Sequence, residues 1–165
     1  MKKFLLSLAM GMIAIGASAQ HTYNVRAGGA VLDKYFALTA MAQANISLNH
    51  HGSWTFSPAM QFAAETDEYG MVAMLHANMG YRTRIGNNCL FAPKVGVAGG
   101  FICVDNEGYS DNGWPIGPSI DLTFEFKHLV IGLTGFFPTN LTEGVDYTHD
   151  DSYIPLVSLT LGYTF

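Results

Sequence analysis

Apolar and polar residues alternate one by one along residues 157–165, in the C-terminal segment 154–165. In an extended strand, one face would carry Val157, Leu159, Leu161, Tyr163 and Phe165, and the other Ser158, Thr160, Gly162 and Thr164. Because successive side chains of a strand point to opposite faces, this period of two indicates a β-strand with one apolar face. The pattern therefore favours an all-β fold.

The same period recurs in eight segments that are separated by turn-like clusters. They are Tyr23–Leu32, Phe36–Leu48, Trp54–Ala64, Met71–Thr83, Cys89–Ile102, Trp114–Phe126, His128–Phe137 and Ile154–Phe165. Their lengths suit tilted membrane strands of ~9–11 residues with short extensions at the ends. The prediction is a closed antiparallel transmembrane β-barrel of eight strands in up-and-down order.

The connections between these segments alternate in length. Short ones fall at Asn49–Ser53, at Arg84–Asn88 and near Lys127, and the two long ones are Cys103–Gly113 and Pro138–Tyr153. Outer-membrane barrels have short periplasmic turns and longer outside loops, and an even number of strands returns both termini to the periplasm. Part of the last connection could also extend the seventh and eighth strands beyond the membrane as a hairpin.

Residues 1–19 have the features of a cleaved export signal. Lys2 and Lys3 precede an apolar run from Phe4 to Ile15, which is too short to span a bilayer, and residues 17–19 (Ala-Ser-Ala) form a small-x-small cleavage site. We therefore expect a signal peptide over residues 1–19 and the barrel domain over residues 20–165. A retained short membrane anchor is the alternative.

Charged residues are scarce, and acidic residues predominate among them. The chain has 8 Lys+Arg and 13 Asp+Glu, and loss of Lys2 and Lys3 would leave six basic residues against thirteen acidic ones, a formal charge of −7. This balance argues against nucleic-acid binding, which needs a basic surface. No apolar run after the signal approaches the ~20 residues of a membrane helix, although only 13% of the chain is charged. That combination is typical of a barrel in which every second residue faces lipid.

The two faces of the alternating segments differ in a way that favours a membrane barrel. A soluble barrel would carry many Lys and Glu on its polar face, whereas here that face holds mainly Gly, Ala, Ser, Thr, Asn and Gln, which suit a narrow lumen. The apolar face is rich in Leu, Ile, Val and Phe. Aromatic residues gather near the strand ends, as in interfacial girdles; they are Tyr23, Trp54, Tyr81, Phe91, Phe101, Trp114, Phe126, Tyr163 and Phe165.

The export signal, the strand–turn rhythm and the closing residues 159–165, Leu-Thr-Leu-Gly-Tyr-Thr-Phe, resemble the small outer-membrane β-barrel proteins of the OmpX/OmpA-like class. The resemblance covers the whole mature chain as a pattern, and its most specific element is the last strand with its C-terminal aromatic residue. In that class such a strand is read by the barrel-assembly machinery. The resemblance implies Sec export and insertion into the outer membrane of a Gram-negative bacterium, but it implies no activity.

Five charged residues are predicted to face the lumen, in its periplasmic half: Arg26, Arg82, Lys94, Asp121 and Glu125. Buried charges must be paired, and three bases nearly balance two acids. We interpret them as a structural salt-bridge cluster; a narrow polar path or a proton relay is the alternative. Eight strands leave room for little more than side chains, so an open pore is not expected.

His76 is predicted to share the lumenal face above that cluster, together with Asn78. A lumenal histidine could serve as a general base, but a hydrogen-bonded interior histidine is the preferred interpretation. No short Ser/His spacing matches a lipid-modifying enzyme, although distant residues could meet in space. His50 and His51 are adjacent in a predicted turn, but two ligands are too few for a metal site.

Eleven of the thirteen carboxylates fall in the predicted outside loops. An acidic rim could share Ca²⁺ or Mg²⁺ with lipopolysaccharide, because both ions prefer oxygen ligands, but plain solubilising charge is the preferred interpretation. No resident cofactor and no established metal site are predicted. The residues of the third and fourth outside loops that could bind a cation or a partner are Asp105, Glu107, Asp111, Glu143, Asp146, Asp150 and Asp151.

The two cysteines, Cys89 and Cys103, lie at opposite ends of one predicted strand. At ~3.3 Å per residue they would be roughly 45 Å apart, far beyond the ~7 Å that a disulfide tolerates between Cα atoms. We therefore expect no intrachain disulfide between them.

Together these features predict a monomeric, non-enzymatic outer-membrane protein in contact with membrane lipid and lipopolysaccharide. Its expected role is membrane stabilisation, or binding and adhesion through acidic outside loops. One alternative is a lipid-modifying acyl hydrolase or transferase, which requires a histidine within hydrogen-bond reach of a serine near the lipid boundary. Another is a soluble periplasmic barrel that binds a small ligand, which requires an apolar cavity and a polar exterior.

Overall fold

A computed structural model describes residues 21–32, 35–49, 51–66, 70–106, 109–139 and 155–165, with the backbone alone for residues 32, 35, 104–106 and 109–112. Within these ranges the chain is all β and contains no helix long and apolar enough to cross a membrane. Its strands are β1 (Thr22–Leu32), β2 (Tyr35–Ser47), β3 (Trp54–Glu65), β4 (Met71–Tyr81), β5 (Thr83–Ile85), β6 (Cys89–Asn106), β7 (Tyr109–Gly113), β8 (Ile116–Phe126), β9 (Leu129–Phe136) and β10 (Leu156–Thr164).

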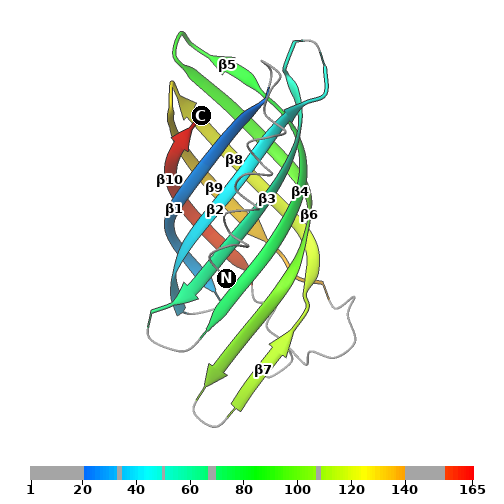
Figure 1. Cartoon of the computed structure of the whole chain (residues 1–165), viewed down its shortest axis with the longest axis vertical. Helices are drawn as coiled ribbons and strands as arrows, with labels where there is room; N and C mark the ends of the chain where they lie inside the picture. Colours follow the sequence, from blue (N-terminus) through cyan, green and yellow to red (C-terminus); the bar gives the residue numbers. More distant parts are fainter. Residues whose placement is uncertain (1–20, 33–34, 50, 67–69, 107–108, 140–154) are drawn as a thin grey trace, which may run out of the picture.

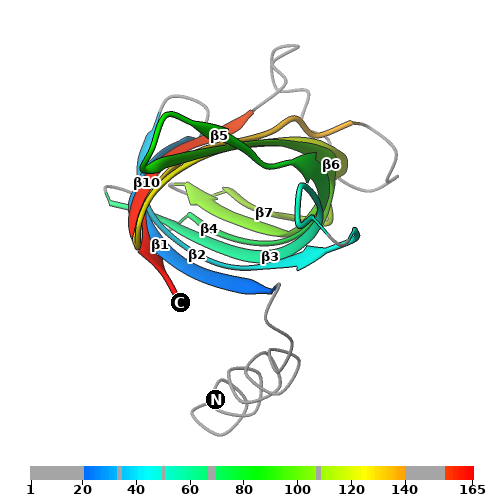
Figure 2. The same cartoon turned by 90° about the horizontal axis from the view of Figure 1, so that it is seen from above.

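These ten segments form the eight staves of one closed barrel. The short β5 follows β4 after Arg82, and β7 leads into β8, so each of these pairs is one interrupted stave. Every stave pairs antiparallel with the next one along the chain, and β1 pairs with β10 from Asn24↔Thr164 to Leu32↔Leu156, which closes the ring (Figures 1 and 2). The prediction of an eight-stranded up-and-down barrel is confirmed.

The two ends of the barrel differ in their connections. We call one end the turn end: it holds the β2–β3 connection, the three residues between β5 and β6, and the two-residue turn of Lys127 and His128 between β8 and β9. Both described termini lie there, where Phe165 N donates to Tyr23 O at 2.8 Å. The opposite end, which we call the loop end, holds β7 and lies at the bottom of Figure 1.

One predicted loop is instead a hairpin. Residues 103–113 were expected to form a long outside loop, but β6 continues to Asn106 and pairs with β7, from Ile102↔Gly113 to Asn106↔Tyr109. The abundant Asp, Asn, Ser and Gly of this segment favour turns, yet a partner strand supplies the hydrogen bonds that its backbone needs. The hairpin projects past the other strands at the loop end (Figure 1).

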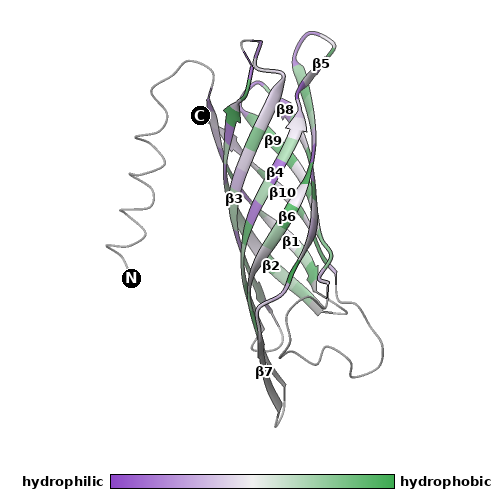
Figure 3. Ribbon diagram, turned by 90° about the vertical axis from the view of Figure 1, so that its right-hand side faces the viewer, coloured by the Kyte–Doolittle hydropathy of each residue, from purple (hydrophilic) through white to green (hydrophobic). Residues whose placement is uncertain are grey.

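The outer surface of the barrel is apolar. Leu159 and Leu161 of β10 are 61% and 56% exposed, while Ser158 and Thr160, between and beside them, are buried in the lumen. The same alternation runs along the other staves, so that exposed Leu, Val, Ile, Met and Phe side chains surround the barrel, and apolar stretches mark the staves in Figure 3. A soluble ligand-binding barrel requires the opposite arrangement, so that alternative is wrong.

The lumen is not polar throughout. Near the loop end, staves all round the barrel except β8 contribute apolar side chains to its interior, which we call the apolar layer. The alternation of the sequence does not predict this layer. Its members are Ala30, Ala37, Ala63, Val72, Met74, Ala98, Ile102, Phe136 and Leu156.

Candidate functional site

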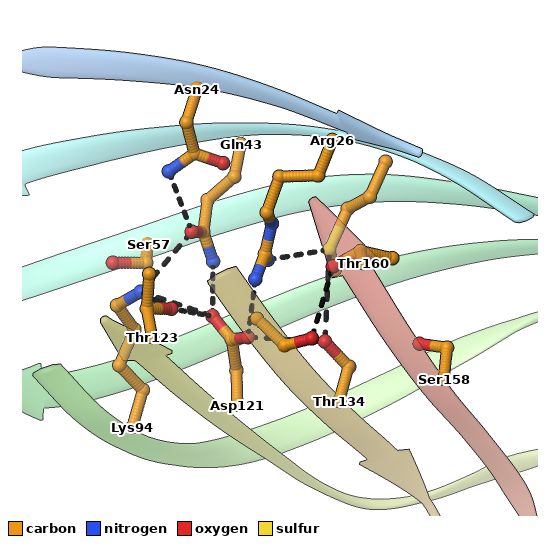
Figure 4. Close-up of polar contacts among 12 residues, drawn as sticks. Asn24, Arg26, Gln43, Ser57, Lys94, Asp121, Thr123, Thr134, Ser158 and Thr160 are labelled. Carbon is orange, nitrogen blue, oxygen red and sulfur yellow. Dashed lines mark hydrogen bonds and ion pairs between the residues drawn. The ribbon is translucent and has the colours of Figure 1, made fainter. Parts of the chain in front are cut away.

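The lumen between the turn end and the apolar layer is organised around Asp121. This carboxylate comes from β8, next to Lys94 of β6 on one side and Thr134 of β9 on the other. Its Oδ1 accepts hydrogen bonds from Arg26 Nη1 at 3.0 Å and Thr134 Oγ1 at 3.1 Å. Its Oδ2 accepts from Gln43 Nε2 at 2.8 Å, from Lys94 Nζ at 3.0 Å and from Thr123 Oγ1 at 3.2 Å. Figure 4 shows this group, which we call the Asp121 cluster.

Two cations therefore share one carboxylate inside the barrel. Arg26, Lys94 and Asp121 are buried, and both ion pairs measure 3.0 Å. The second cation is stabilised further because Lys94 Nζ also donates to Gln43 Oε1 at 3.1 Å and to Thr123 Oγ1 at 3.0 Å. Removing one member of a buried ion pair leaves a charge without a partner, which costs about 3–5 kcal/mol. The cluster is thus an interior brace that links β1, β2, β6, β8 and β9.

The Arg26 guanidinium occupies space left by a glycine. A Cβ at Gly132 of β9 would collide with Arg26 Nη1. The second terminal nitrogen, Nη2, contacts Met41 Sδ of β2 at 2.7 Å. A residue without a side chain at position 132 therefore lets a long cation cross the lumen to reach Asp121.

A second ion pair lies closer to the turn end. Arg82, which follows β4, donates from Nη2 to Glu125 Oε2 of β8 at 2.8 Å. The Arg82 side chain is 12% exposed and that of Glu125 is 3% exposed. The five charged residues predicted to face the lumen thus form two groups in the structure: Arg26 and Lys94 on Asp121, and Arg82 on Glu125.

His76 belongs to a separate group between the Asp121 cluster and the apolar layer. Its Nδ1 lies 3.4 Å from Ser119 Oγ, and its Nε2 lies 3.0 Å from Gln61 Oε1. Ser119 Oγ donates to Asn78 Oδ1 at 2.6 Å. His76 is therefore a hydrogen-bonded interior histidine beside a serine, with an amide in the place where a hydrolytic triad has a carboxylate.

Sequence reasoning missed how many neutral groups join the charges. Alternation along the strands puts Gln43, Thr123 and Thr134 on the lumenal face, but their contacts with Asp121 depend on strand register, which alternation does not reveal. Met41 is an apolar residue, so its residue type does not predict a contact with the Arg26 guanidinium. Its even spacing from Gln43 along β2 was the available signal.

Within the described residues, no three His, Cys, Asp or Glu side chains lie together as a metal site would require. Cys89 and Cys103 both belong to β6 and are free. Asp105 and Asp111 belong to the β6–β7 hairpin, but their side chains lie outside the described part of the chain. Of the two adjacent histidines, His51 is exposed in its turn, and His50 lies outside the described residues. So do the other predicted loop residues, Glu107, Glu143, Asp146, Asp150 and Asp151.

No family model and no curated protein matches the sequence. Solved structures do match the fold. Neisserial surface protein A (NspA) gives a TM-score of 0.65 at 9% identity, over 88% of this chain and 96% of that one. The outer membrane enzyme PagL gives 0.59 at 10% identity, over 86% and 98%. The N-terminal β-barrel domain of Pseudomonas aeruginosa OprF gives 0.56 at 11% identity, over 87% and 97%.

These similarities concern the fold, because the identities are low. The chain has the fold of small outer-membrane β-barrels, as the sequence analysis predicted. By their names the matched proteins include both a surface protein and an enzyme, so the fold alone does not decide the role.

Proposed function

We propose that this chain is an integral outer-membrane protein, closed to ions and without enzymatic activity, that acts through its loop end at the cell surface. The role of that end is to stabilise the membrane or to bind a partner. The observation that carries the proposal is the combination of an apolar outer surface with a lumen that holds buried, ion-paired and hydrogen-bonded side chains and an apolar layer.

The apolar outer surface supports insertion into a membrane. A continuous band of exposed Leu, Val, Ile and Phe would be unfavourable in water at about 25 cal/mol per Å² of apolar surface. Hydrocarbon removes that cost, while the closed ring of antiparallel strands leaves few backbone groups without partners. The signal-like residues 1–19 favour export, so the outer membrane is the proposed location.

The side chains inside the lumen support a barrel that is closed to ions. The two ion-paired groups and the His76 group occupy the polar part of the lumen, and the apolar layer lies beyond them toward the loop end. An apolar constriction opposes the passage of ions because it does not hold water. Transport through the interior is therefore not the proposed role.

The loop end is the proposed outer face. Short turns are expected on the periplasmic side and longer segments outside. The β6–β7 hairpin lies at the loop end, and by sequence eleven of the thirteen carboxylates are expected in the loops there, where Ca²⁺ or Mg²⁺ could join them to lipopolysaccharide. We further propose that the barrel-assembly machinery inserts the protein by recognising β10. The inserted protein is proposed to act as a monomer.

The proposal can be tested in whole cells and in planar bilayers. A short epitope inserted between Glu107 and Gly108 should be labelled by antibody on intact cells, and one inserted at Gly86 should be labelled only after permeabilisation. The purified barrel should give no steps of ionic current. Labelling at Gly86 on intact cells would overturn the orientation, and regular conductance steps would overturn the closed lumen.

An acyl hydrolase remains the competing function, because His76 lies near Ser119. Three features argue against it: the serine hydroxyl donates to Asn78, Gln61 replaces a carboxylate, and both residues of the pair are buried in the lumen rather than beside lipid. A fluorophosphonate probe should therefore leave the protein unlabelled. Labelling that disappears in Ser119→Ala would favour the enzyme.

A further inference from the structure

The Asp121 cluster holds one more cation than it holds carboxylates. Arg26 and Lys94 both pair with Asp121, and none of the three side chains is exposed. The other carboxylate in this part of the lumen, that of Glu125, is paired with Arg82. The cluster therefore carries a formal charge of +1 in the interior of the barrel. A buried charge without a counter-charge is strongly unfavourable.

The hydrogen bonds show which side chain holds the excess charge. Lys94 Nζ donates to three oxygens at 3.0–3.1 Å, which are Gln43 Oε1, Asp121 Oδ2 and Thr123 Oγ1. Three acceptors match the three N–H donors of an ammonium group. Asp121 in turn accepts from five side chains, as an ionised carboxylate can. Lys94 and Asp121 thus form a saturated, neutral pair, and the excess charge lies on Arg26.

The Arg26 guanidinium lacks acceptors along one of its edges. Within the described residues its Nη1 donates to Asp121, its Nη2 meets only the sulfur of Met41 at 2.7 Å, and its Nε has no partner. A thioether is a weak acceptor and carries no charge. Nε and Nη2 form the edge of the guanidinium that can bind a ligand through two parallel hydrogen bonds. A fully buried cation therefore directs two donors at an uncharged sulfur.

The residues around this edge can make room for a small ion. Arg26 pairs with Gly162 of β10 and lies against Gly132 of β9, neither of which has a side chain. Met41 is unbranched and has three rotatable bonds, so a change of rotamer moves its sulfur away from Nη2. A small anion can then accept hydrogen bonds from Nε and Nη2 together.

Basic side chains lead from the turn end to this position. Arg84 of β5 pairs with Leu90, and Leu90 pairs with Glu125, so Arg84 belongs to the lumenal face, and it is exposed at the turn end. Between the turn end and the apolar layer, that face carries two carboxylates, Asp121 and Glu125, and four basic residues: Arg26, Arg82, Arg84 and Lys94. A passage lined by an excess of one charge concentrates the opposite ion. The apolar layer lies beyond the cluster, so an anion that enters is bound and not conducted.

We propose that the lumen binds one small monovalent anion, of the size of chloride, against the Nε–Nη2 edge of Arg26. The anion enters from the turn end and neutralises the Asp121 cluster. The Arg82–Glu125 pair lies between the turn end and the site, so bulky organic anions such as gluconate are excluded. This site concerns the interior of the barrel and is additional to the proposed role of the loop end.

Urea unfolding in vesicles tests the site when gluconate is replaced stepwise by chloride at constant ionic strength. An ion that binds only the folded state should lower the unfolding equilibrium constant about tenfold when its concentration reaches about nine times its dissociation constant. Arg26→Gln should lose this chloride dependence, whereas Arg26→Lys, which keeps the charge, should retain it. The matched control is Lys127→Gln, which removes an exposed cation and should respond to chloride as the wild type does.

Diffraction from crystals of the wild type grown in bromide locates the ion directly. We expect an anomalous peak beside Nε and Nη2 of Arg26. Unfolding of the wild type that does not depend on chloride would overturn the site, as would an equal dependence in Arg26→Gln. Bromide found only at exposed basic side chains would also overturn it. If Arg26→Gln does not fold, the wild-type titration and the bromide peak still decide the question.

Discussion

At the scale of the residue, one carboxylate organises most of the interior. Asp121 accepts hydrogen bonds from five side chains that come from β1, β2, β6, β8 and β9. The sequence was sufficient to place Asp121 and its two cations in the lumen, because alternation fixes which face a residue occupies. It was not sufficient to pair them, because the pairing depends on register and on the way the ring closes.

Asp121→Asn should be the most damaging substitution among the lumenal charges. It leaves Arg26 and Lys94 buried without a carboxylate, so the free energy of unfolding should fall by about 3–5 kcal/mol. Urea titration in vesicles, followed by tryptophan fluorescence, measures this. Glu125→Gln is the control and should cost less, because Arg82 is partly exposed and can turn toward water. Equal losses in the two variants would contradict the central role of Asp121.

Gly132→Ala tests the space that Arg26 occupies. The new methyl group would meet the guanidinium, so the ion pair to Asp121 should lengthen and the free energy of unfolding should fall by about 1–3 kcal/mol. Gly135→Ala, on the same strand, is the matched control: its Cβ would lie 3.2 Å from the ring of Phe137, without touching the cluster. A loss at position 135 as large as that at position 132 would contradict this account.

At the scale of the element, the strands were predictable wherever one face is apolar and the other polar. The β6–β7 hairpin was not, because residues 103–113 carry the Asp, Asn, Ser and Gly that usually mark loops. From Val104↔Asp111 to Asn106↔Tyr109 its two strands pair only with each other, and no lipid-facing pattern is needed there. Composition therefore describes the environment of this segment better than it describes its backbone.

Replacing residues 104–112 by a two-residue Asn-Gly turn should leave the barrel folded. The strands of the barrel are already joined by β4–β6 and β6–β8 pairing on the turn-end side of the hairpin. The β4–β6 pairing extends to Met71↔Cys103, and the β6–β8 pairing extends to Gly99↔Ile116. The shortened protein should keep the change in gel mobility on boiling that a folded barrel shows, and its free energy of unfolding should change by less than about 1 kcal/mol. Loss of the folded band would show that the hairpin is part of the barrel's stability.

At the scale of the whole molecule, alternation and an even strand count were enough to predict a closed barrel with an apolar outside. They were not enough to predict the apolar layer. The start of β4 reads Met-Val-Ala-Met-Leu, so both faces are apolar there, and periodicity gives no signal. Only the closed ring reveals that Val72 and Met74 face Phe136 and Leu156 across the lumen.

Two phenylalanines, one inside the barrel and one on its outer surface, test which face is which. Phe136 is 1% exposed in the apolar layer, whereas Phe62 is 44% exposed on the outer surface. Phe136→Ala should lower the free energy of unfolding in vesicles by about 3–5 kcal/mol, because it opens a cavity among side chains. Phe62→Ala should cost much less, since lipid fills the space. The reverse order would mean that the two faces have been assigned wrongly.

The central claim is that this chain is a barrel inserted in the outer membrane. Fractionation of cells that express the full chain, followed by electrophoresis with and without boiling, tests it most directly. We expect a protein in the outer-membrane fraction whose mobility changes on boiling, because a closed barrel survives detergent. Recovery of the protein from the soluble periplasmic fraction, with the same mobility before and after boiling, would contradict it.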